Sequence, residues 1–312
     1  MKLSKAKIAA LIVLMVLLLS AGALYVPDKT VAELSPHWAV APSQFMTVDG
    51  QQVHIRDEGV KTDPVPIVLL HGTSASLHTW QGWTEALQQK RRVIRFDLPA
   101  FGLTGPFNNR DYSIEHYTKF VQQVLAQLKV EQYVLAGNSL GGNIAWHVAV
   151  AAPQQVKQLI LVDAAGYPYQ AKSIPIGFRI AQIPVLNKMM EYTLPRNMVE
   201  ASVRNVYADP NKVSAELVDR YYDLTLREGN RQALVDRFKQ ISASDSEKVK
   251  QLTMPTLILW GKQDQLIPVE YAQHFQQDIK GSQLVVFDNL GHVPHEEDPQ
   301  QTISAVMKFL AL

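Results

Sequence analysis

The chain has 312 residues, of which 47% are hydrophobic, and this is enough to bury one large core. Its formal net charge of +1 and the lack of a long basic run give no sign of nucleic-acid binding. It contains no cysteine, which excludes disulfides and thiolate metal sites.

Residues 1–26 begin with three lysines and continue as an uncharged, apolar segment from residue 8 to residue 26. At about 1.5 Å per residue, such a segment is just long enough to cross the hydrocarbon core of a bilayer. The motif Ala21-Gly22-Ala23 also matches the small-residue pattern of a signal-peptide cleavage site. We therefore predict an N-terminal membrane anchor or, alternatively, a removed signal peptide. Positively charged flanks of such segments stay on the cytoplasmic side, so both alternatives place the remaining chain outside the cytoplasm. An uncleaved anchor would leave it bound to the membrane, and a removed signal peptide would leave it secreted or periplasmic.

Residues 27–43 contain three prolines and are predicted to form a linker. Next, Asp49-Gly50 separates two short strand patterns, which is a strong signal for a β-hairpin. Apolar runs that predict buried strands then alternate with helical patterns. These runs cover residues 66–70, 92–96, 132–137, 158–162, 255–260 and 283–287. The alternation predicts an α/β fold with a mostly parallel central sheet flanked by helices.

One interval, residues 166–246, breaks this alternation and divides the core into a first part, 44–165, and a second part, 247–312. It holds helical patterns without a clear strand and follows the sixth predicted strand. An insertion at the carboxyl edge of a parallel sheet lies over the site that such sheets form there. We therefore predict a helical lid whose apolar residues, among them Phe178 and Ile180, contact the substrate. The alternative is a packed helical subdomain whose apolar residues serve only its own core.

The sequence Gly137-Asn138-Ser139-Leu140-Gly141 lies between an apolar strand pattern and a helical pattern of small residues. The glycines on both sides of the serine fit a sharp turn in which the backbones of strand and helix come close together. Such a turn exposes the serine hydroxyl at a helix N-terminus, where free N–H groups can stabilise an oxyanion. We predict that Ser139 is a catalytic nucleophile. The alternative is a glycine-rich turn with an inert serine.

A serine nucleophile needs a base to take its proton and an acid to orient that base. His292 follows the last predicted strand and a glycine, and we predict it as the base, with His295 as the near alternative. Two aspartates follow predicted strands and compete for the role of the acid. We favour Asp264, because the chain order serine, aspartate, histidine is that of one known architecture. Asp163 is then expected to shape its own loop.

These motifs resemble those of the α/β-hydrolase superfamily over roughly residues 45–312. The resemblance rests on His71-Gly72, Asp97-Leu98-Pro99-Ala100-Phe101-Gly102, the turn at Ser139, Trp260-Gly261-Lys262-Gln263-Asp264 and Gly291-His292. Ala100 departs from the glycine that relatives often carry. Within the superfamily the chain is similar to lid-bearing bacterial lipases and esterases, to monoacylglycerol-lipase-like membrane hydrolases and to C–C bond hydrolases. The resemblance implies an oxyanion hole formed by the backbone N–H groups of Thr73 and Leu140, with His71 packed inside its loop.

No metal-ligand cluster, phosphate-binding loop or cofactor motif is evident in the sequence, so we expect neither a cofactor nor a metal. The resemblance and the apolar lid predict a serine hydrolase that acts on carboxylic esters, with a small-molecule ester or lipid-like substrate. The membrane would be a further partner through residues 1–26. One alternative is another hydrolase specificity, such as a C–C bond hydrolase, an amidase or a perhydrolase. The other is a non-catalytic binding protein that retains the triad.

Overall fold

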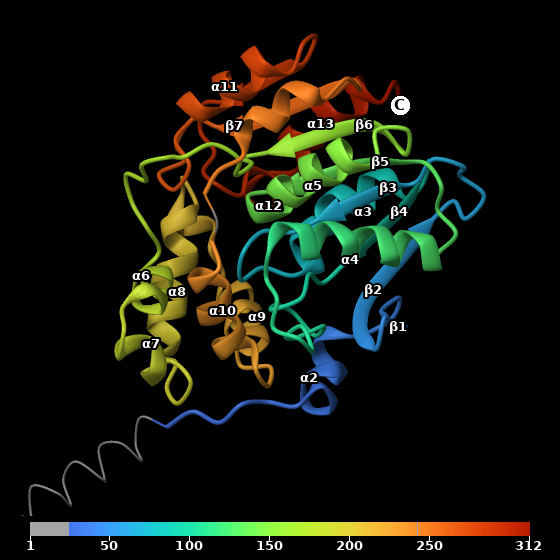
Figure 1. Cartoon of the computed structure of the whole chain (residues 1–312). Helices are drawn as coiled ribbons and strands as arrows, with labels where there is room; N and C mark the ends of the chain where they lie inside the picture. Colours follow the sequence, from blue (N-terminus) through green and yellow to red (C-terminus); the bar gives the residue numbers. More distant parts are fainter. Residues whose placement is uncertain (1–24, 242) are drawn as a thin grey trace, which may run out of the picture.

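The computed structural model describes residues 25–241 and 243–312, which fold around one 8-stranded sheet (Figure 1). The strand order is β1-β2-β4-β3-β5-β6-β7-β8. Strand β2 runs antiparallel to both of its neighbours, β1 and β4, and the other neighbouring pairs are parallel. The predicted α/β fold with a mostly parallel sheet is therefore confirmed. The strands are β1 (Gln44–Val48), β2 (Gln51–Gly59), β3 (Ile67–Leu70), β4 (Arg92–Phe96), β5 (Tyr133–Asn138), β6 (Val156–Val162), β7 (Thr256–Gly261) and β8 (Gln283–Phe287).

The hairpin predicted at Asp49-Gly50 joins β1 to β2. Both turn residues have positive φ, 49° for Asp49 and 77° for Gly50, which is the backbone signature of a type I′ turn. Val48 and Gln51 pair directly on either side of this turn. The two-residue turn thus sets the register of the edge pair, as its sequence predicts.

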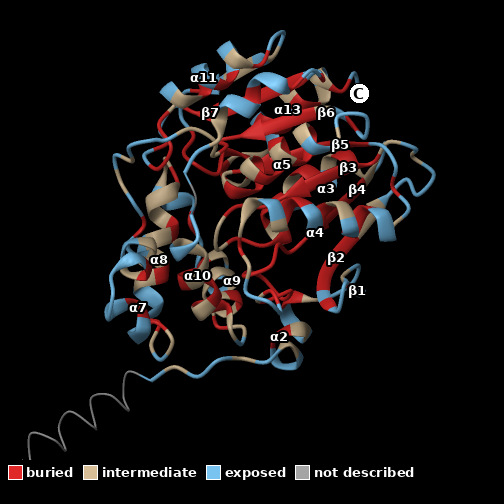
Figure 2. Cartoon of the chain, in the orientation of Figure 1, coloured by how far each residue is buried: buried red, intermediate tan, exposed pale blue. Residues whose placement is uncertain are grey.

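Helices cover both faces of the sheet (Figure 1), and the strands between them are largely buried (Figure 2). Helices α4 (Ile114–Gln127), α5 (Leu140–Ala151) and α11 (Glu270–Asp278) pack on one face through the larger apolar cluster. Helices α3 (Gln81–Leu87) and α13 (Pro299–Phe309) pack on the other face through a second apolar cluster. Because both faces are covered, all residues of β3 are buried, as its continuous apolar sequence predicts.

A set of α-helices lies between β6 and β7 and forms a body beside the sheet (Figure 1). Several of its apolar side chains, including Val199 and Val203, form a cluster of their own. Val293, which follows the predicted base in the sequence, belongs to the same cluster. The insertion therefore has its own core and also packs against the loop that carries His292. Its helices are α6 (Ile176–Gln182), α7 (Leu186–Met189), α8 (Arg196–Val206), α9 (Ala215–Thr225) and α10 (Asn230–Lys239).

Part of the segment expected to be a linker forms helix α2 (Val31–Trp38). A capping box starts the helix: the Thr30 side chain accepts the backbone N–H of Glu33, and the Glu33 side chain accepts that of Thr30. Trp38 is buried, and its indole N–H donates to the Asp223 carboxylate of the insertion at 3.0 Å. The prolines predicted a linker, but the capping box and this buried contact favour a packed helix.

The predicted localisation, with the catalytic domain anchored to a membrane outside the cytoplasm or released there, is corrected by the structure. Among residues 25–241 and 243–312, no helix is both long enough and apolar enough to cross a membrane. Residues 1–24, which carried most of that prediction, lie outside the described part of the chain. The anchor and the membrane partner are therefore not retained.

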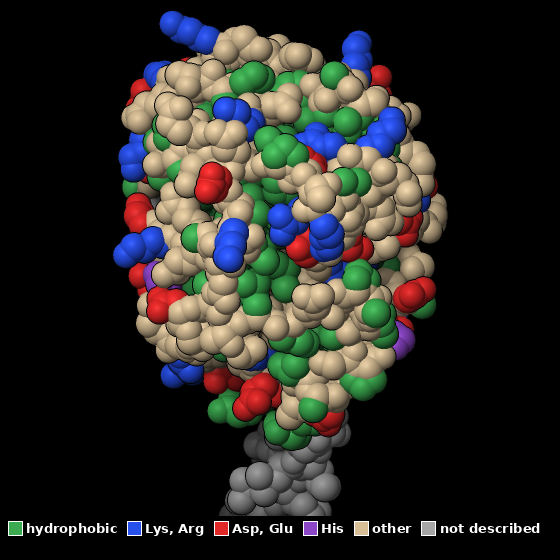
Figure 3. Space-filling model, turned by 90° about the vertical axis from the view of Figure 1, so that its right-hand side faces the viewer, with side chains coloured by type: hydrophobic (Ala, Val, Ile, Leu, Met, Phe, Trp, Pro, Cys, Tyr) green, Lys and Arg blue, Asp and Glu red, His purple; other side chains and the backbone are tan. Residues whose placement is uncertain are grey.

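One face of the molecule carries charges of both signs. On the face that Figure 3 shows, Lys and Arg side chains are interspersed with Asp and Glu side chains, and apolar side chains are visible between them. Surface ion pairs add to this mixing, for example Lys262 with Asp288 at 2.8 Å. A mixed surface of this kind does not present a field of one sign to a charged macromolecule.

Candidate active site

Ser139 stands on a sharp turn between β5 and α5, at the carboxyl end of a central strand. Its φ of 53° and ψ of −115° lie outside the regions that L-residues normally occupy. The flanking glycines make this turn possible, because a Cβ on Gly137 would lie 2.2 Å from the carbonyl oxygen of Gly141. A Cβ on Gly141 would lie 2.2 Å from the carbonyl oxygen of Leu70. The turn therefore holds the serine at the edge of the sheet by close backbone packing.

His292 and Asp264 follow the neighbouring strands β8 and β7, so they meet at the same edge of the sheet. Oδ2 of Asp264 lies 2.7 Å from Nδ1 of His292. The other carboxylate oxygen, Oδ1, accepts the backbone N–H groups of Leu266 at 2.8 Å and Ile267 at 2.9 Å. Both side chains are nearly inaccessible, with 1% of Asp264 and 4% of His292 exposed. Because Nδ1–H donates to the carboxylate, the other ring nitrogen, Nε2, is left as an acceptor.

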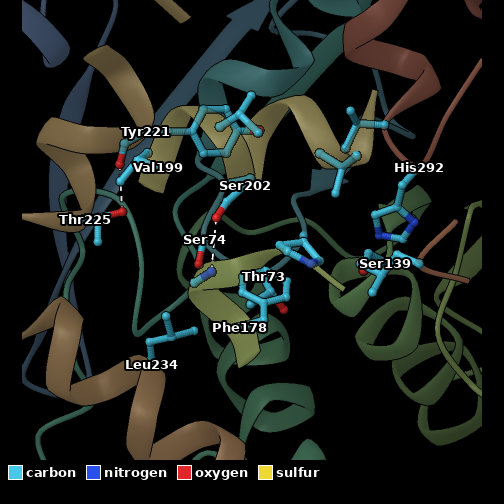
Figure 4. A pocket seen from close by; sticks show the side chains of 18 of the residues that line it. Thr73, Ser74, Ser139, Phe178, Val199, Ser202, Tyr221, Thr225, Leu234 and His292 are labelled. Atoms are coloured by element: carbon cyan, nitrogen blue, oxygen red, sulfur yellow. Dashed lines mark hydrogen bonds between the residues drawn. The ribbon is translucent and has the colours of Figure 1, made fainter. Parts of the chain in front are cut away.

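A cavity of about 90 Å³ opens beside Ser139 and His292. Figure 4 shows the His292 ring next to the Ser139 side chain, with Thr73, Ser74 and Phe178 further along the cavity. Helices of the insertion form the facing wall, and most of their lining side chains are apolar. No Lys, Arg, Asp or Glu from the described ranges, 25–241 and 243–312, contributes to the lining. The cavity that adjoins the serine is therefore largely apolar.

The hydroxyl groups in the insertion wall already have hydrogen-bond partners. Ser202 donates to the carbonyl oxygen of Met198 at 2.8 Å, and Thr225 donates to that of Tyr221 at 2.7 Å. The phenol of Tyr221 donates to the Glu296 carboxylate at 2.9 Å. Since these donors are satisfied within the protein, an apolar group can lie against them without leaving a polar group unpaired.

The two residues predicted to form an oxyanion hole both lie next to Ser139. Leu140 is the first residue of α5, so its N–H has no partner within the helix. Thr73 lines the cavity together with the serine. In the part of the chain that the structure describes, neither backbone N–H donates a hydrogen bond to the protein. Both groups are therefore available to a ligand beside the serine.

Asp163 follows β6, the strand between those that carry Ser139 and Asp264. Its Oδ1 accepts the backbone N–H of Gly261 at 2.9 Å. Asp163, Asp264 and His292 each place one oxygen or nitrogen atom within 4.8 Å of the others. A metal ion could bridge such a set, and the 2.7 Å between Asp264 and His292 is equally the distance of a direct hydrogen bond. Burial, and next the charge of Asp264, raises the pKa of Asp163 well above its usual range.

Two other histidines near the site have structural surroundings. His71 donates from Nδ1 to the next residue's carbonyl oxygen at 2.8 Å, and its Nε2 accepts the Leu98 N–H at 2.9 Å. Burial lowers its pKa, so the ring is a neutral part of its loop, as expected. Nε2 of His295 lies 3.1 Å from the Thr79 hydroxyl, and its ring packs against Trp80 with 4.0 Å between ring centroids. His292, and not His295, is thus the histidine that meets an aspartate and the cavity.

Three contacts that the sequence did not predict hold the His292 loop in place. Asn138, the residue before the serine, donates from Nδ2 to the His292 carbonyl oxygen at 3.0 Å. Val206, the last residue of α8, accepts the His292 backbone N–H at 2.8 Å. Glu297 accepts the N–H of the preceding glycine at 2.8 Å. The position of Asn138 next to Ser139 in the sequence could have pointed to its contact with the His292 loop. The contact of Val206 uses a backbone carbonyl, which any residue has, so the sequence gives no signal for it.

Of the two apolar residues expected to contact the substrate, Phe178 lines the cavity. Ile180 is not among the described residues that line it, and it packs against the main apolar cluster instead. Two positions along a helix correspond to a rotation of about 200°, so the two side chains point in nearly opposite directions. The expectation for Ile180 is corrected for this reason.

The comparison with protein families agrees with this geometry. Residues 65–299 match a family model described as alpha/beta hydrolase fold, and this match covers more than half of the chain. The parallel sheet, the strained turn at Ser139 and the hydrogen-bonded His292 and Asp264 lie where the resemblance in the sequence implies. The chain belongs to the α/β-hydrolase family.

Related proteins include hydrolases with different substrates. The chain is 28% identical over 281 residues to 2-hydroxy-6-oxo-2,4-heptadienoate hydrolase of Pseudomonas putida, with 86% of this chain and 96% of that protein covered. It is 28% identical over 255 residues to pimeloyl-(acyl-carrier protein) methyl ester esterase of Nitrosomonas europaea, with 81% and 97% covered. A meta-cleavage product hydrolase of Pseudomonas fluorescens shares the fold, with a TM-score of 0.74 and 24% identity over 86% of this chain and 97% of that one. Hydrolase activity is thus supported, and the type of bond has to be argued from the site.

Proposed function

We propose that the chain is a serine hydrolase that cleaves carboxylic esters with apolar acyl groups, using Ser139, His292 and Asp264. The cavity beside Ser139 carries this proposal. Its wall is largely apolar, its insertion hydroxyls are satisfied, and no Lys, Arg, Asp or Glu of residues 25–241 and 243–312 lines it. An apolar acyl chain gains from burial in such a wall, whereas a charged group would lose its hydration without a partner.

The proposed reaction begins with proton transfer from the Ser139 hydroxyl to Nε2 of His292. The serine oxygen attacks the ester carbonyl carbon, and the protonated histidine then gives its proton to the departing alcohol. Asp264 holds the ring through Nδ1 and stabilises the imidazolium that forms. Water, activated by the same histidine, hydrolyses the resulting acyl-enzyme and restores the serine.

Negative charge develops on the former carbonyl oxygen during both steps. The unpartnered N–H groups of Thr73 and Leu140 are proposed to stabilise it, since they flank the serine. The second of these begins helix α5, whose N-terminal partial positive charge acts in the same direction. Donors of this kind are each worth about 3–4 kcal/mol of transition-state stabilisation in related chemistry.

We also propose that residues 166–246 act as a lid over a core formed by residues 44–165 and 247–312. Side chains of α6 and α8 supply much of the apolar cavity wall. The lid would therefore select the acyl group as well as exclude water. Its own apolar cluster would keep the wall in shape.

Cleavage of a C–C bond is the second candidate, and the 28% identity to the Pseudomonas putida hydrolase supports it. That protein is named for a heptadienoate, which carries a carboxylate. In this chain the described cavity lining offers such a group no Lys or Arg. Because a buried carboxylate needs a charged or multiply hydrogen-bonded partner, the lining favours a neutral ester. An amidase, a perhydrolase or a non-catalytic binding protein would have the same fold. No feature of the cavity lining favours one of these functions over an esterase.

The test uses the purified chain with p-nitrophenyl esters, with 2-hydroxy-6-oxo-2,4-heptadienoate and with a fluorophosphonate probe. Hydrolysis of the esters with labelling at Ser139 supports the proposal. Faster cleavage of the dienoate than of any ester would replace it by the C–C reaction. Binding of esters without turnover or labelling would leave a non-catalytic protein.

A further inference from the structure

Asp163 is a second carboxyl group packed against the acid of the proposed triad. It is fully buried, with 0% of the side chain exposed, and has a positive φ of 42°. One of its oxygen atoms lies within 4.8 Å of a carboxylate oxygen of Asp264 and of a ring nitrogen of His292. The strained backbone and the complete burial indicate that the surrounding structure, rather than local preference, holds this carboxyl group in place.

The hydrogen bonds of the two carboxyl groups differ. Asp264 accepts three N–H groups, from Leu266, Ile267 and His292. Asp163 accepts one, from Gly261 through Oδ1, and its Oδ2 has no partner in the described part of the chain. Two adjacent buried carboxylates cannot both be charged at low cost, so one of the pair takes up a proton. The carboxyl group with fewer donors and an unpartnered oxygen is the one that takes it.

The charges around Asp163 agree with this assignment. Burial is the main cause that raises its pKa, followed by the negative charge of Asp264, and the carboxylate of Glu297 adds to both. The Gly261 N–H acts in the opposite direction and is outweighed. His292 faces the pair from the loop after β8, and its Nδ1–H donates a hydrogen bond to Asp264. A proton on Asp163 would therefore lie close to the Asp264 carboxylate, since one oxygen of each side chain is within 4.8 Å of the other.

We propose that Asp163 is a positioning residue that keeps its proton and donates it from Oδ2 in a hydrogen bond to the Asp264 carboxylate. This inference rests on the proposed function, because it concerns how the proposed acid is held. With this bond, four donors fix the orientation of the Asp264 carboxylate that holds His292. The pair also carries one negative charge instead of two, so the charge facing the histidine matches the single imidazolium charge that forms during turnover.

The experiment compares Asp163→Asn with Asp163→Leu. Asparagine keeps both an acceptor for the Gly261 N–H and a donor for Asp264, whereas leucine has a similar volume and neither group. We expect Asp163→Asn to retain most of the wild-type kcat, and Asp163→Leu to lose about tenfold or more in kcat with little change in KM. An Asn variant as impaired as the Leu variant, with both folded by circular dichroism, would overturn the proposal.

A second readout follows the proton itself and does not need turnover. Infrared spectra near neutral pH are expected to contain a C=O stretch of a protonated carboxyl group that Asp163→Asn removes. The pKa of Asp163 is raised in the folded protein above its value in the unfolded chain. The stability that the protonated group contributes is therefore complete at a pH below the unfolded-state pKa, and it is lost as the pH rises from there through the folded-state pKa. The melting temperature of Asp163→Asn relative to wild type should therefore increase with pH. Absence of the infrared band, or a pH-independent difference, would overturn the proposal.

The two proposals fail in different ways. If wild-type protein hydrolyses no ester but shows the infrared band, the proposed function fails and the protonated pair stands. If wild type hydrolyses esters and the band is missing, the proposed function stands and the role of Asp163 is refuted.

Discussion

The backbone N–H of His292 donates to the carbonyl oxygen of Val206 at 2.8 Å. A residue at the end of α8 in the insertion thus holds the loop that carries the proposed base. The contact is tight, because a Cβ on Gly291 would lie 2.5 Å from the same carbonyl oxygen. The insertion is therefore coupled to the chemistry through the position of His292, in addition to forming a wall of the cavity.

A methyl group at Gly291 should test this coupling. Gly291→Ala is expected to push the His292 loop away from α8 and to lower kcat for an ester by on the order of tenfold or more, because misplacement by even 1 Å is costly. The matched control is Gly281→Ala, whose added Cβ meets nothing within 4 Å although its φ is 77°. That control should lose some stability through backbone strain and keep its turnover. Equal kcat values for both variants would show that the contact with Val206 does not position the base.

Ser139→Ala should abolish ester turnover and fluorophosphonate labelling while the fold is kept. Removal of a triad nucleophile typically costs three or more orders of magnitude in rate. Ser304→Ala, on the exposed side of α13, is the control and should behave as wild type. The measurement is kcat with a p-nitrophenyl ester, together with the mass of the labelled protein. Residual activity above about a tenth of wild type would contradict the assignment of the nucleophile.

Asp264→Asn should lower kcat strongly, by up to about ten-thousandfold, because an amide cannot keep the His292 ring in the tautomer with a free Nε2. The control is Asp288→Asn, an exposed aspartate paired with Lys262, whose loss should change little. The comparison is made at a substrate concentration above KM, after circular dichroism has shown that both variants are folded. A mild effect of Asp264→Asn beside a severe effect of Asp163→Asn would move the acid to the earlier strand.

Much of the fold follows from local patterns in the sequence. The hairpin at Asp49-Gly50 and the turn at Ser139 depend on residues that are adjacent in the chain, and both lie where the motifs predict. The buried strand β3 has the continuous apolar sequence of a strand covered on both faces. Asp264 and His292 were predicted from their places after strands and from the chain order serine, aspartate, histidine, and the structure joins them by a hydrogen bond.

The remaining features depend on long-range packing or on orientation. Helix α2 is short and gains much of its support from contacts with Asp223, far away in the sequence, so the prolines of this segment were misleading. Ile180 failed as a cavity residue because the phase of a seven-residue helix cannot be read from its apolar content. The proximity of Asp163 to Asp264, on which its proposed role rests, depends on packing between strands that no local pattern encodes.

Acid sensitivity should arise in part from His295. Burial holds the pKa of this ring well below its usual range, so the folded protein keeps it neutral while the unfolded chain protonates it below about pH 6.5. The stability that depends on the neutral ring is present above that value and is lost as pH falls toward the folded pKa, at up to about 1.4 kcal/mol per pH unit. His295→Gln, which is neutral at every pH, should therefore lose less stability than wild type between neutral pH and about pH 5. Urea unfolding at several pH values measures this difference, with His37→Gln at an exposed position as control. Parallel curves for wild type and His295→Gln would contradict the prediction.

The acyl preference should depend on Phe178 and not on Ile180. Each methylene group buried in the cavity contributes about 0.8 kcal/mol, or roughly fourfold in kcat/KM. We therefore expect kcat/KM to rise from acetate through longer p-nitrophenyl esters until the acyl chain fills the cavity. Phe178→Ser places a polar group in the wall and should flatten this rise, because Phe178 lines the cavity. Ile180→Ser makes a comparable change on the same helix outside the lining, so it should leave the dependence on chain length intact even if stability falls. Fastest turnover with acetate, or the same flattening in both variants, would leave a small-ester hydrolase in which the insertion has no part in acyl recognition.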